Sequence, residues 1–129
     1  MRRTEKTRVF TVEGANALLP QLREFLRGVQ DEIPYQRRLA PDIRRAAAKA
    51  KLSGGSPQGV PYVASVLRMK GLVGKIHALG VEMKDLQRGL CDFPHRRADR
   101  LVYLCWHPGE EKIGGWHELN AGFAGRKPL

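Results

Sequence analysis

The stretch MKGLVGKIHALGVEMKDL, residues 69–86, decides how the rest of this chain is interpreted. Six of its apolar side chains recur at alternating intervals of three and four residues: Met69, Leu72, Ile76, Leu79, Met83 and Leu86. This spacing aligns them along one seam of an α-helix, which is typical of a helix packed nearly parallel or antiparallel against another. The sequence therefore predicts a long helix that starts near Pro61, continues to about residue 88 and has a second helix as its partner.

Three glycines interrupt this predicted helix. Gly71, Gly74 and Gly80 weaken it by about 1 kcal/mol each relative to alanine, and we expect them to let a neighbouring backbone approach closely. The seam, with Met69 and Met83 in it, would serve packing in the core or contact between copies. We therefore expect a homo-oligomer that forms through the helices.

The partner helix is predicted upstream, from residue 12. Thr11 suits its N-cap, because a threonine hydroxyl accepts a hydrogen bond from a backbone amide two or three residues further on. One apolar stripe follows at helical spacing: Ala15, Leu18, Leu19, Leu22, Phe25, Leu26, Val29 and Ile33. Pro20, Pro34 and Pro41 lack the backbone donor that a helix interior needs. We therefore expect a kink or restart at Pro20, further breaks at the later prolines, and a separate basic helix over residues 43–52.

After Gly89 the sequence changes to short stretches rich in β-branched and aromatic residues, at 90–93, 101–107 and 112–118. Turn-like segments separate them, which predicts a three-stranded antiparallel meander with residues 8–11 as an extended lead-in or fourth strand. The tail is expected to be irregular. The predicted fold class is α+β: a long antiparallel helical hairpin over about 12–88, its first helix broken by prolines, packed with a β-unit over about 89–120 in a single domain of residues 1–129.

The composition fits one globular domain of 129 residues, with 42% hydrophobic and 28% charged residues. No apolar run approaches the roughly 20 residues that span a bilayer, and the first residues lack the apolar segment of a signal peptide. We therefore expect a cytoplasmic protein with no membrane partner, in which Cys91 and Cys105 stay reduced.

A net charge of +10 attracts polyanions. The densest basic stretch lies between the two predicted helical arms: Arg37, Arg38, Arg44, Arg45, Lys49 and Lys51. It would form a nucleic-acid-binding surface. Because basic composition alone favours that function only modestly, nucleic acid is an alternative partner.

Reactive side chains concentrate in the C-terminal third. Cys105 and His117, with Asp92 and Glu110 as carboxylates, form a candidate metal set, since thiolate and imidazole together suit zinc or a similar divalent ion. Their spacing matches no established zinc pattern. A second interpretation is a nucleophile, with Cys105 activated by His107 or His117.

A third interpretation is a small-ligand pocket walled by Trp106 and Trp116, with Arg126 as an anion clamp. The candidate ligand-binding residues are Asp85, Asp92, Trp106, Glu110, Trp116 and Arg126. The structural alternative is that Cys105 is a small buried residue, His117 a hydrogen-bonded one and the tryptophans part of the core.

Several ordered motifs cover nearly the whole chain: FTVEGANALLP (10–20), KDL (84–86), GLCDFP (89–94), LCW (104–106), GE (109–110), WHE (116–118) and GFAGRKPL (122–129). They resemble an uncharacterised prokaryotic family, the domain of unknown function 2203 (DUF2203). The resemblance implies no activity, substrate or cofactor. It disfavours Cys91 and His107 as site residues, because an aliphatic and a polar or basic residue are expected there.

Three classes of function remain. The first is a small ligand- or metal-binding domain with a polar site in the β-unit, and whether such a site would be enzymatic is left open. The second is a structural or adaptor protein that associates through its helical hairpin. The third is a basic module that binds nucleic acid. The first ranks slightly above the second, because acid, thiol, imidazole and guanidinium groups in one short segment require a ligand or a buried polar network.

Overall fold

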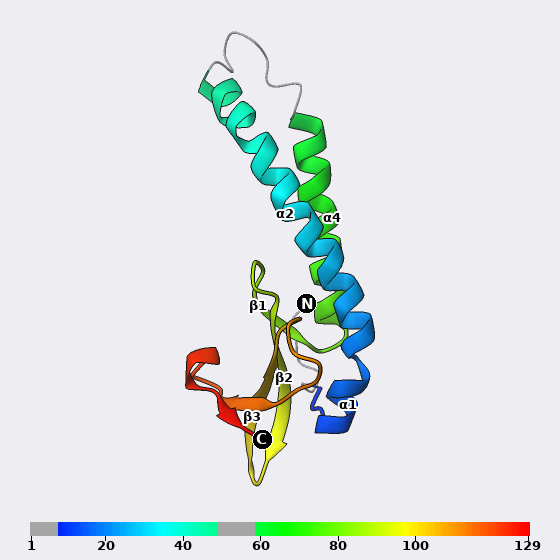
Figure 1. Cartoon of the computed structure of the whole chain (residues 1–129), viewed down its shortest axis with the longest axis vertical. Coiled ribbons are helices and arrows are strands. Elements are labelled where there is room, and N and C mark those ends of the chain that lie inside the picture. Colours follow the sequence, from blue (N-terminus) through cyan, green and yellow to red (C-terminus); the bar gives the residue numbers. More distant parts are fainter. Residues whose placement is uncertain (1–7, 49–58) are drawn as a thin grey trace, which may run out of the picture.

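A computed structural model describes residues 8–48 and 59–129 of the chain. The helices come first: α1 (Val12–Ala17), α2 (Leu19–Ala48) and α4 (Gly59–Ala78). The strands follow: β1 (Glu82–Asp85), β2 (Leu90–Arg97), β3 (Arg100–Trp106), β4 (Gly115–Glu118) and β5 (Lys127–Pro128), with a 3-10 helix η1 (Phe123–Gly125) before the last. Helices α2 and α4 lie side by side and project from the sheet (Figure 1). The predicted α+β fold, a helical hairpin with an antiparallel sheet, is confirmed.

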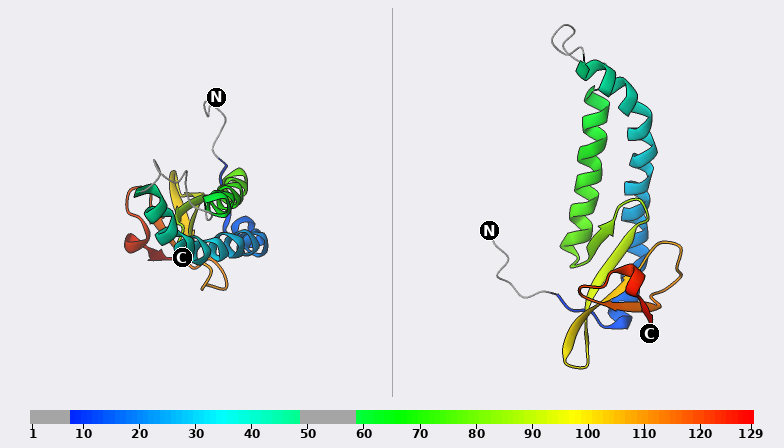
Figure 2. Two further views of the ribbon diagram at one scale, coloured as in Figure 1. Left: turned by 90° about the horizontal axis from the view of Figure 1, so that it is seen from above. Right: turned by 90° about the vertical axis from the view of Figure 1, so that its left-hand side faces the viewer.

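Helix α2 is one continuous helix, so the predicted breaks at Pro34 and Pro41 are wrong. Both prolines are exposed and lie on the side away from α4, so the carbonyl groups that lose their helical partner can be hydrated. Figure 2 shows α2 bending toward α4 in its last third, as expected for prolines on the outer side. Residues 43–48 end α2 instead of starting a separate helix, and residues 49–52 lie outside the described part of the chain.

The start of the hairpin agrees better with the sequence. Thr11 caps α1 by accepting a hydrogen bond from the Gly14 amide at 2.9 Å. Leu18 separates α1 from α2, which places Pro20 in the first turn of a new helix, where its missing donor costs nothing. Of the two outcomes predicted at Pro20, a kink or a restart of the helix, the structure shows the restart.

Helix α4 ends at Ala78, eight residues before Leu86, so the predicted continuation to about residue 88 is wrong. Gly80 takes a φ of +93°, which turns the chain out of the helix, and an added Cβ there would lie 2.9 Å from the Arg8 side chain. Met83 consequently belongs to β1, and Leu86 to the turn that follows.

Two residues of the predicted seam within α4, Leu72 and Ile76, do face α2. Ile76 is fully buried, and Leu72 lies so near α2 that a Cβ at Gly28 would be 2.7 Å from its Cδ1 atom. The close approach of the two helices is therefore made at Gly28. At Gly71 and Gly74, by contrast, an added Cβ would meet no atom of the described chain within 4 Å, so the expected close approach at these glycines is absent within one chain.

The sheet has five strands in the order β1-β2-β3-β4-β5, each antiparallel to its neighbour. The meander was predicted, but β1 and the short β5 in the tail were not. Residues 8–11 stay outside the sheet as an extended segment, in which the Phe10 amide donates to the Pro94 carbonyl at 2.7 Å.

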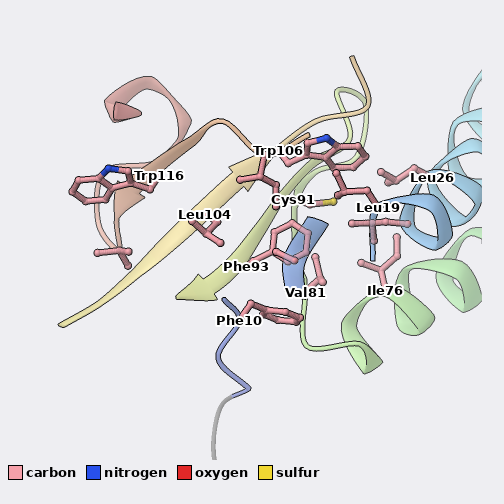
Figure 3. Packing of buried hydrophobic residues seen from close by; sticks show 14 residues of the cluster. Phe10, Leu19, Leu26, Ile76, Val81, Cys91, Phe93, Leu104, Trp106 and Trp116 are labelled. Atoms are coloured by element: carbon pink, nitrogen blue, oxygen red, sulfur yellow. The ribbon is translucent and has the colours of Figure 1, made fainter. Parts of the chain in front are cut away.

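The inner face of the sheet forms the core with the helices (Figure 3). Phe93, Leu104 and Trp106 are fully buried there, and the Phe93 ring meets that of Phe10 edge to face at 5.3 Å. Trp106 lies beside Leu26 of α2 (Figure 3). Since strand residues alternate between faces, the neighbours of these residues point to the opposite, outer face.

Candidate functional site

The outer face of the sheet carries most of the polar side chains that the sequence singled out. Strand register pairs Asp92 of β2 with Cys105 of β3, and Tyr103 of β3 with His117 of β4. These four residues share a face, because directly paired residues of antiparallel strands do so and residues two apart do as well. Asp92, Cys105 and His117 are nevertheless buried. We call the polar side chains on this outer face of the sheet the polar layer.

Asp92 and His117 form the centre of this layer. The His117 Nε2 atom lies 3.1 and 3.2 Å from the two carboxylate oxygens of Asp92, while Nδ1 lies 2.8 Å from the Glu118 carbonyl. A carbonyl only accepts hydrogen bonds, so Nδ1 must carry a proton. A second proton must then lie between Nε2 and Asp92, because otherwise two acceptors would face each other. The pair therefore holds two protons.

The environment of Asp92 favours retention of that proton. Burial raises the pKa of Asp92, and the neighbouring His117 opposes this effect only in part. The ammonium of Lys84 lies 3.9 Å from Asp92 and 3.2 Å from Glu82, and the Tyr103 hydroxyl donates to Glu82 at 2.9 Å. The residues of this layer thus bond mainly to one another.

A second polar group adjoins the first at Cys105. Arg126 forms an ion pair with Glu110 at 2.5 Å and donates to the Cys105 carbonyl at 3.4 Å. The Arg126 side chain crosses the sheet where Gly115 leaves room for it, since a Cβ there would overlap the guanidinium group. Burial raises the pKa of the Cys105 thiol to about 11, so the protonated thiol predominates at neutral pH. A thiolate nucleophile at this position is therefore unfavourable.

The predicted metal set does not assemble. Within residues 8–48 and 59–129, no group of three or more histidine, cysteine, aspartate and glutamate side chains is placed to hold a metal ion. Asp92 and His117 meet as predicted, but Glu110 is engaged by Arg126, and Cys105 adjoins Asp92 without a third ligand. The structure therefore brings together the pair of Asp92 and His117, and not the set of metal ligands that the sequence suggested.

The predicted tryptophan-walled pocket does not form either. Trp106 and Trp116 lie on the inner face, whereas Arg126 crosses the outer face. Trp106 is part of the core and donates from Nε1 to the Glu110 carbonyl at 2.9 Å. Asp85 has a local role, since its carboxylate accepts from the Arg88 amide at 3.0 Å and closes the turn between β1 and β2.

Three participants of the polar layer were missed by the sequence analysis: Glu82, Lys84 and Tyr103. Glu82 and Lys84 were assigned to the helix, because the apolar spacing continued through Met83. The alternation of Val81, Glu82, Met83 and Lys84 between apolar and charged residues was the available signal for a strand.

The described part of the basic stretch of the nucleic-acid alternative lies in the second half of α2. Arg37 and Arg44 are exposed, Arg45 forms an ion pair with Asp42, and the guanidinium of Arg38 lies 5.6 Å from the centroid of the Tyr35 ring. Lys49 and Lys51 fall outside the described residues. The nucleic-acid function therefore stays a prediction.

The fold and the site together define an α+β protein in which a projecting helical hairpin is joined to a sheet with a buried polar layer on its outer face. The chain belongs to the family described as uncharacterized conserved protein DUF2203, whose model matches residues 8–129. Neither the curated proteins nor the solved structures include a match to this chain. Among the helices described, none is long and apolar enough to span a bilayer.

Proposed function

We propose that this protein is a structural or adaptor protein that self-associates through the outward face of α4. The observation that carries the proposal is an uncovered apolar stripe on this helix, opposite α2. Its outward stripe consists of Val60, Val63, Leu67, Gly71, Gly74 and Ala78. Val60, Val63 and Leu67 are 81%, 55% and 62% exposed, which is unusual for three aligned large apolar residues in an isolated chain.

The charged side chains of α4 lie away from the centre of this outward face. The 20-residue helix has three charged side chains, and two of them contact α2: Arg68 pairs with Glu32, and Lys75 lies 5.9 Å from the centroid of the Phe25 ring. Only Lys70 remains at the edge of the outward stripe. Such a helix, apolar on two sides, suits packing between two neighbours.

A groove of about 460 Å³ continues the apolar surface toward β1. Its lining residues come from α4, β1 and the turn after β1: Met69, Lys70, Val73, Gly74, His77, Met83 and Leu86. Met69 and Met83, which the sequence placed in the seam expected to mediate self-association, both line this groove. Methionine side chains adapt to irregular partners, which favours an interface that extends beyond a single helix.

A second copy of this chain fits the stripe best. The large residues occupy the first half of α4 and the small residues Gly71, Gly74 and Ala78 the second half. In an antiparallel two-fold pair, the halves exchange, so that Leu67 of each copy opposes Gly71 of the other and Val60 opposes Ala78. Each copy then supplies the volume that the other lacks.

The two glycines support the same arrangement. A glycine in a helix interior costs about 1 kcal/mol relative to alanine, and a Cβ added at Gly71 or Gly74 would meet no atom of the described chain within 4 Å. A closely packed partner helix would offset this cost. The polar layer on the sheet fits a structural role as well, since its buried side chains mainly bond to one another.

The test is the mass in solution, measured by light scattering during size-exclusion chromatography. The unaltered chain is expected to elute as a dimer, and Leu67→Lys as a monomer, because a buried lysine would lie against the partner. Gly71→Trp is expected to block the close approach without harming the folded chain, since its side chain points into open space.

Gln21→Lys, which adds the same charge at an exposed position of α2, is the matched control and should stay dimeric. A monomeric mass for the unaltered chain at 100 μM would refute the proposal. A dimer that survives both Leu67→Lys and Gly71→Trp would place the interface elsewhere and refute it too.

A further inference from the structure

Trp116 differs from Trp106 in what surrounds it. Both rings are buried on the inner face, but Trp116 lies at the edge of the apolar cluster that is remote from the helices (Figure 3). Besides its apolar neighbours in the cluster, cationic side chains lie close to its ring. The charged groups of Arg97, Lys127 and Arg100 lie 4.4, 5.0 and 5.9 Å from its ring centroid.

These cations are only partly neutralised. Arg100 forms a bidentate pair with Glu118, at 3.0 and 2.5 Å. In the part of the chain that is described, Arg97 and Lys127 have no carboxylate within ion-pair distance, and neither donates a side-chain hydrogen bond. Three cations and one carboxylate leave a local excess of positive charge at this end of the sheet.

The indole N–H of Trp116 is a buried donor that finds no acceptor among the described residues. A buried donor that is left unpaired loses the hydrogen bond that it makes with water in the unfolded chain, so it destabilises the fold. The equivalent group of Trp106 is satisfied by the Glu110 carbonyl. The orphan donor and the unpaired cations lie together, on β2, β4 and β5, and both require the same thing, an acceptor that carries negative charge.

We propose that Trp116, Arg97 and Lys127 form a binding site for a phosphate group. A tetrahedral oxyanion has enough acceptor oxygens to meet the indole N–H, the guanidinium fork and the ammonium group at once. Arg97 and Lys127 are long side chains at the surface, so their rotation admits the anion to the edge of the indole. The source is a free phosphate or the phosphate of a small phosphorylated molecule. This site is independent of α4 and of the proposed self-association.

The two tryptophans make the test internally controlled. In a ¹⁵N-labelled sample, each indole N–H gives its own NMR signal, and Trp116→Phe assigns them. Addition of inorganic phosphate is expected to shift the Trp116 signal in a saturable manner and to leave the Trp106 signal unchanged. Chloride at the same ionic strength serves as the comparison and should produce no saturable shift.

Charge removal tests the two cations. Lys127→Gln and Arg97→Gln are each expected to weaken the phosphate affinity by about tenfold, as befits the loss of a charge-assisted hydrogen bond. Lys112→Gln, at an exposed position outside the site, is the matched control and should change the affinity by less than twofold. A small phosphorylated probe such as glycerol 3-phosphate then distinguishes the sources, since tighter binding than inorganic phosphate assigns the site to a phosphorylated molecule and equal binding to the free anion.

Three results would overturn the site. The first is a Trp116 signal that phosphate leaves unmoved, the second is an equal shift of both indole signals, and the third is a loss of affinity in Lys112→Gln as large as that in Lys127→Gln. The last result would show attraction by the net charge of +10 instead of a built site. Since all the charge variants alter surface side chains, their folding is checked in the same spectra.

Discussion

At the scale of single residues, the Asp92–His117 pair determines how this protein should respond to pH. Burial raises the pKa of Asp92 above its ordinary value of 3.8, so the folded chain holds this proton more tightly than the unfolded chain. The contribution of Asp92 to stability is therefore fully present below pH 3.8 and is lost as the pH rises through the raised pKa.

Asp92→Asn tests this dependence. The asparagine amide donates to Nε2 of a neutral His117, so the pair stays satisfied without a titrating proton. We expect the free energy of unfolding of Asp92→Asn, measured by urea unfolding, to increase relative to that of the unaltered chain as the pH rises from 4 to 8. Asp99→Asn, in the exposed turn between β2 and β3, is the control for loss of a surface carboxylate. A difference that stays constant with pH would contradict the two-proton pair.

Asp92→Ala separates the hydrogen bond from the charge. It leaves Nε2 of His117 buried and unpaired, which is expected to cost about 2 kcal/mol in the free energy of unfolding at pH 7. Asp92→Asn, which keeps the hydrogen bond, should lose much less in the same urea titration. Equal losses for the two variants would mean that the carboxylate charge itself stabilises the fold.

At the scale of elements, the apolar periodicity of the sequence correctly predicted the helices, but it did not predict the turn that ends α4. The apolar spacing through Ile76 correctly paired two helices, and Thr11 correctly marked a helix start. The same spacing carried the prediction past Ala78, because periodicity does not register the positive φ of Gly80. As a result β1 was lost, and with it Glu82 and Lys84 of the polar layer. Gly80, three residues after His77 in the last turn of α4, was the available signal for the end of the helix.

The candidate site shows the same division. The sequence predicted a strand over 101–107 and included Asp92 and His117 in its candidate set, and the structure brings these two side chains into contact. The sequence could not show that Arg126 crosses the sheet to Glu110, because this contact depends on the path of the tail around β4. Nor could it place the two tryptophans relative to Arg126, since that requires the strand register.

A polar contact between the helices, in which only Ser65 is fully buried, gives a prediction at this scale. Glu32 of α2 accepts hydrogen bonds from Ser65 at 2.6 Å and from Arg68 at 2.9 Å, and the Arg68 hydrogen bond lowers the pKa of Glu32. Glu32→Ala is expected to lower the free energy of unfolding by about 1–2 kcal/mol, because it weakens the pairing of the buried Ser65 hydroxyl.

The pH trend of Glu32 is opposite to that of Asp92. A lowered folded pKa means that its contribution is present above the ordinary value of 4.5 and is lost as the pH falls through the folded pKa. The cost of Glu32→Ala in urea unfolding should therefore shrink when the pH is taken from 7 to 3. The neighbouring Asp31→Ala, exposed on α2, is the control, and an equal and equally pH-dependent loss there would exclude a specific role for the contact.

At the scale of the whole molecule, the helical hairpin is the part of the fold that is least covered by the rest of the described chain. It projects beyond the sheet (Figure 1), so over much of its length α2 and α4 have only each other as packing partners. The outward stripe of α4 then stays in water unless a second copy covers it. Stability and self-association should therefore be linked in this protein.

This linkage predicts a melting temperature that depends on protein concentration. If folded chains pair through α4, each tenfold rise in concentration favours the folded dimer by about 1.4 kcal/mol, and the Tm rises by a few degrees. Scanning calorimetry of the unaltered chain between 5 and 500 μM should show this rise. Leu67→Lys, which removes the pairing, should melt at one temperature throughout, while Gln21→Lys should follow the unaltered chain. A Tm independent of concentration in all three would mean that the exposed stripe of α4 contributes nothing to the stability of the folded state through a second copy.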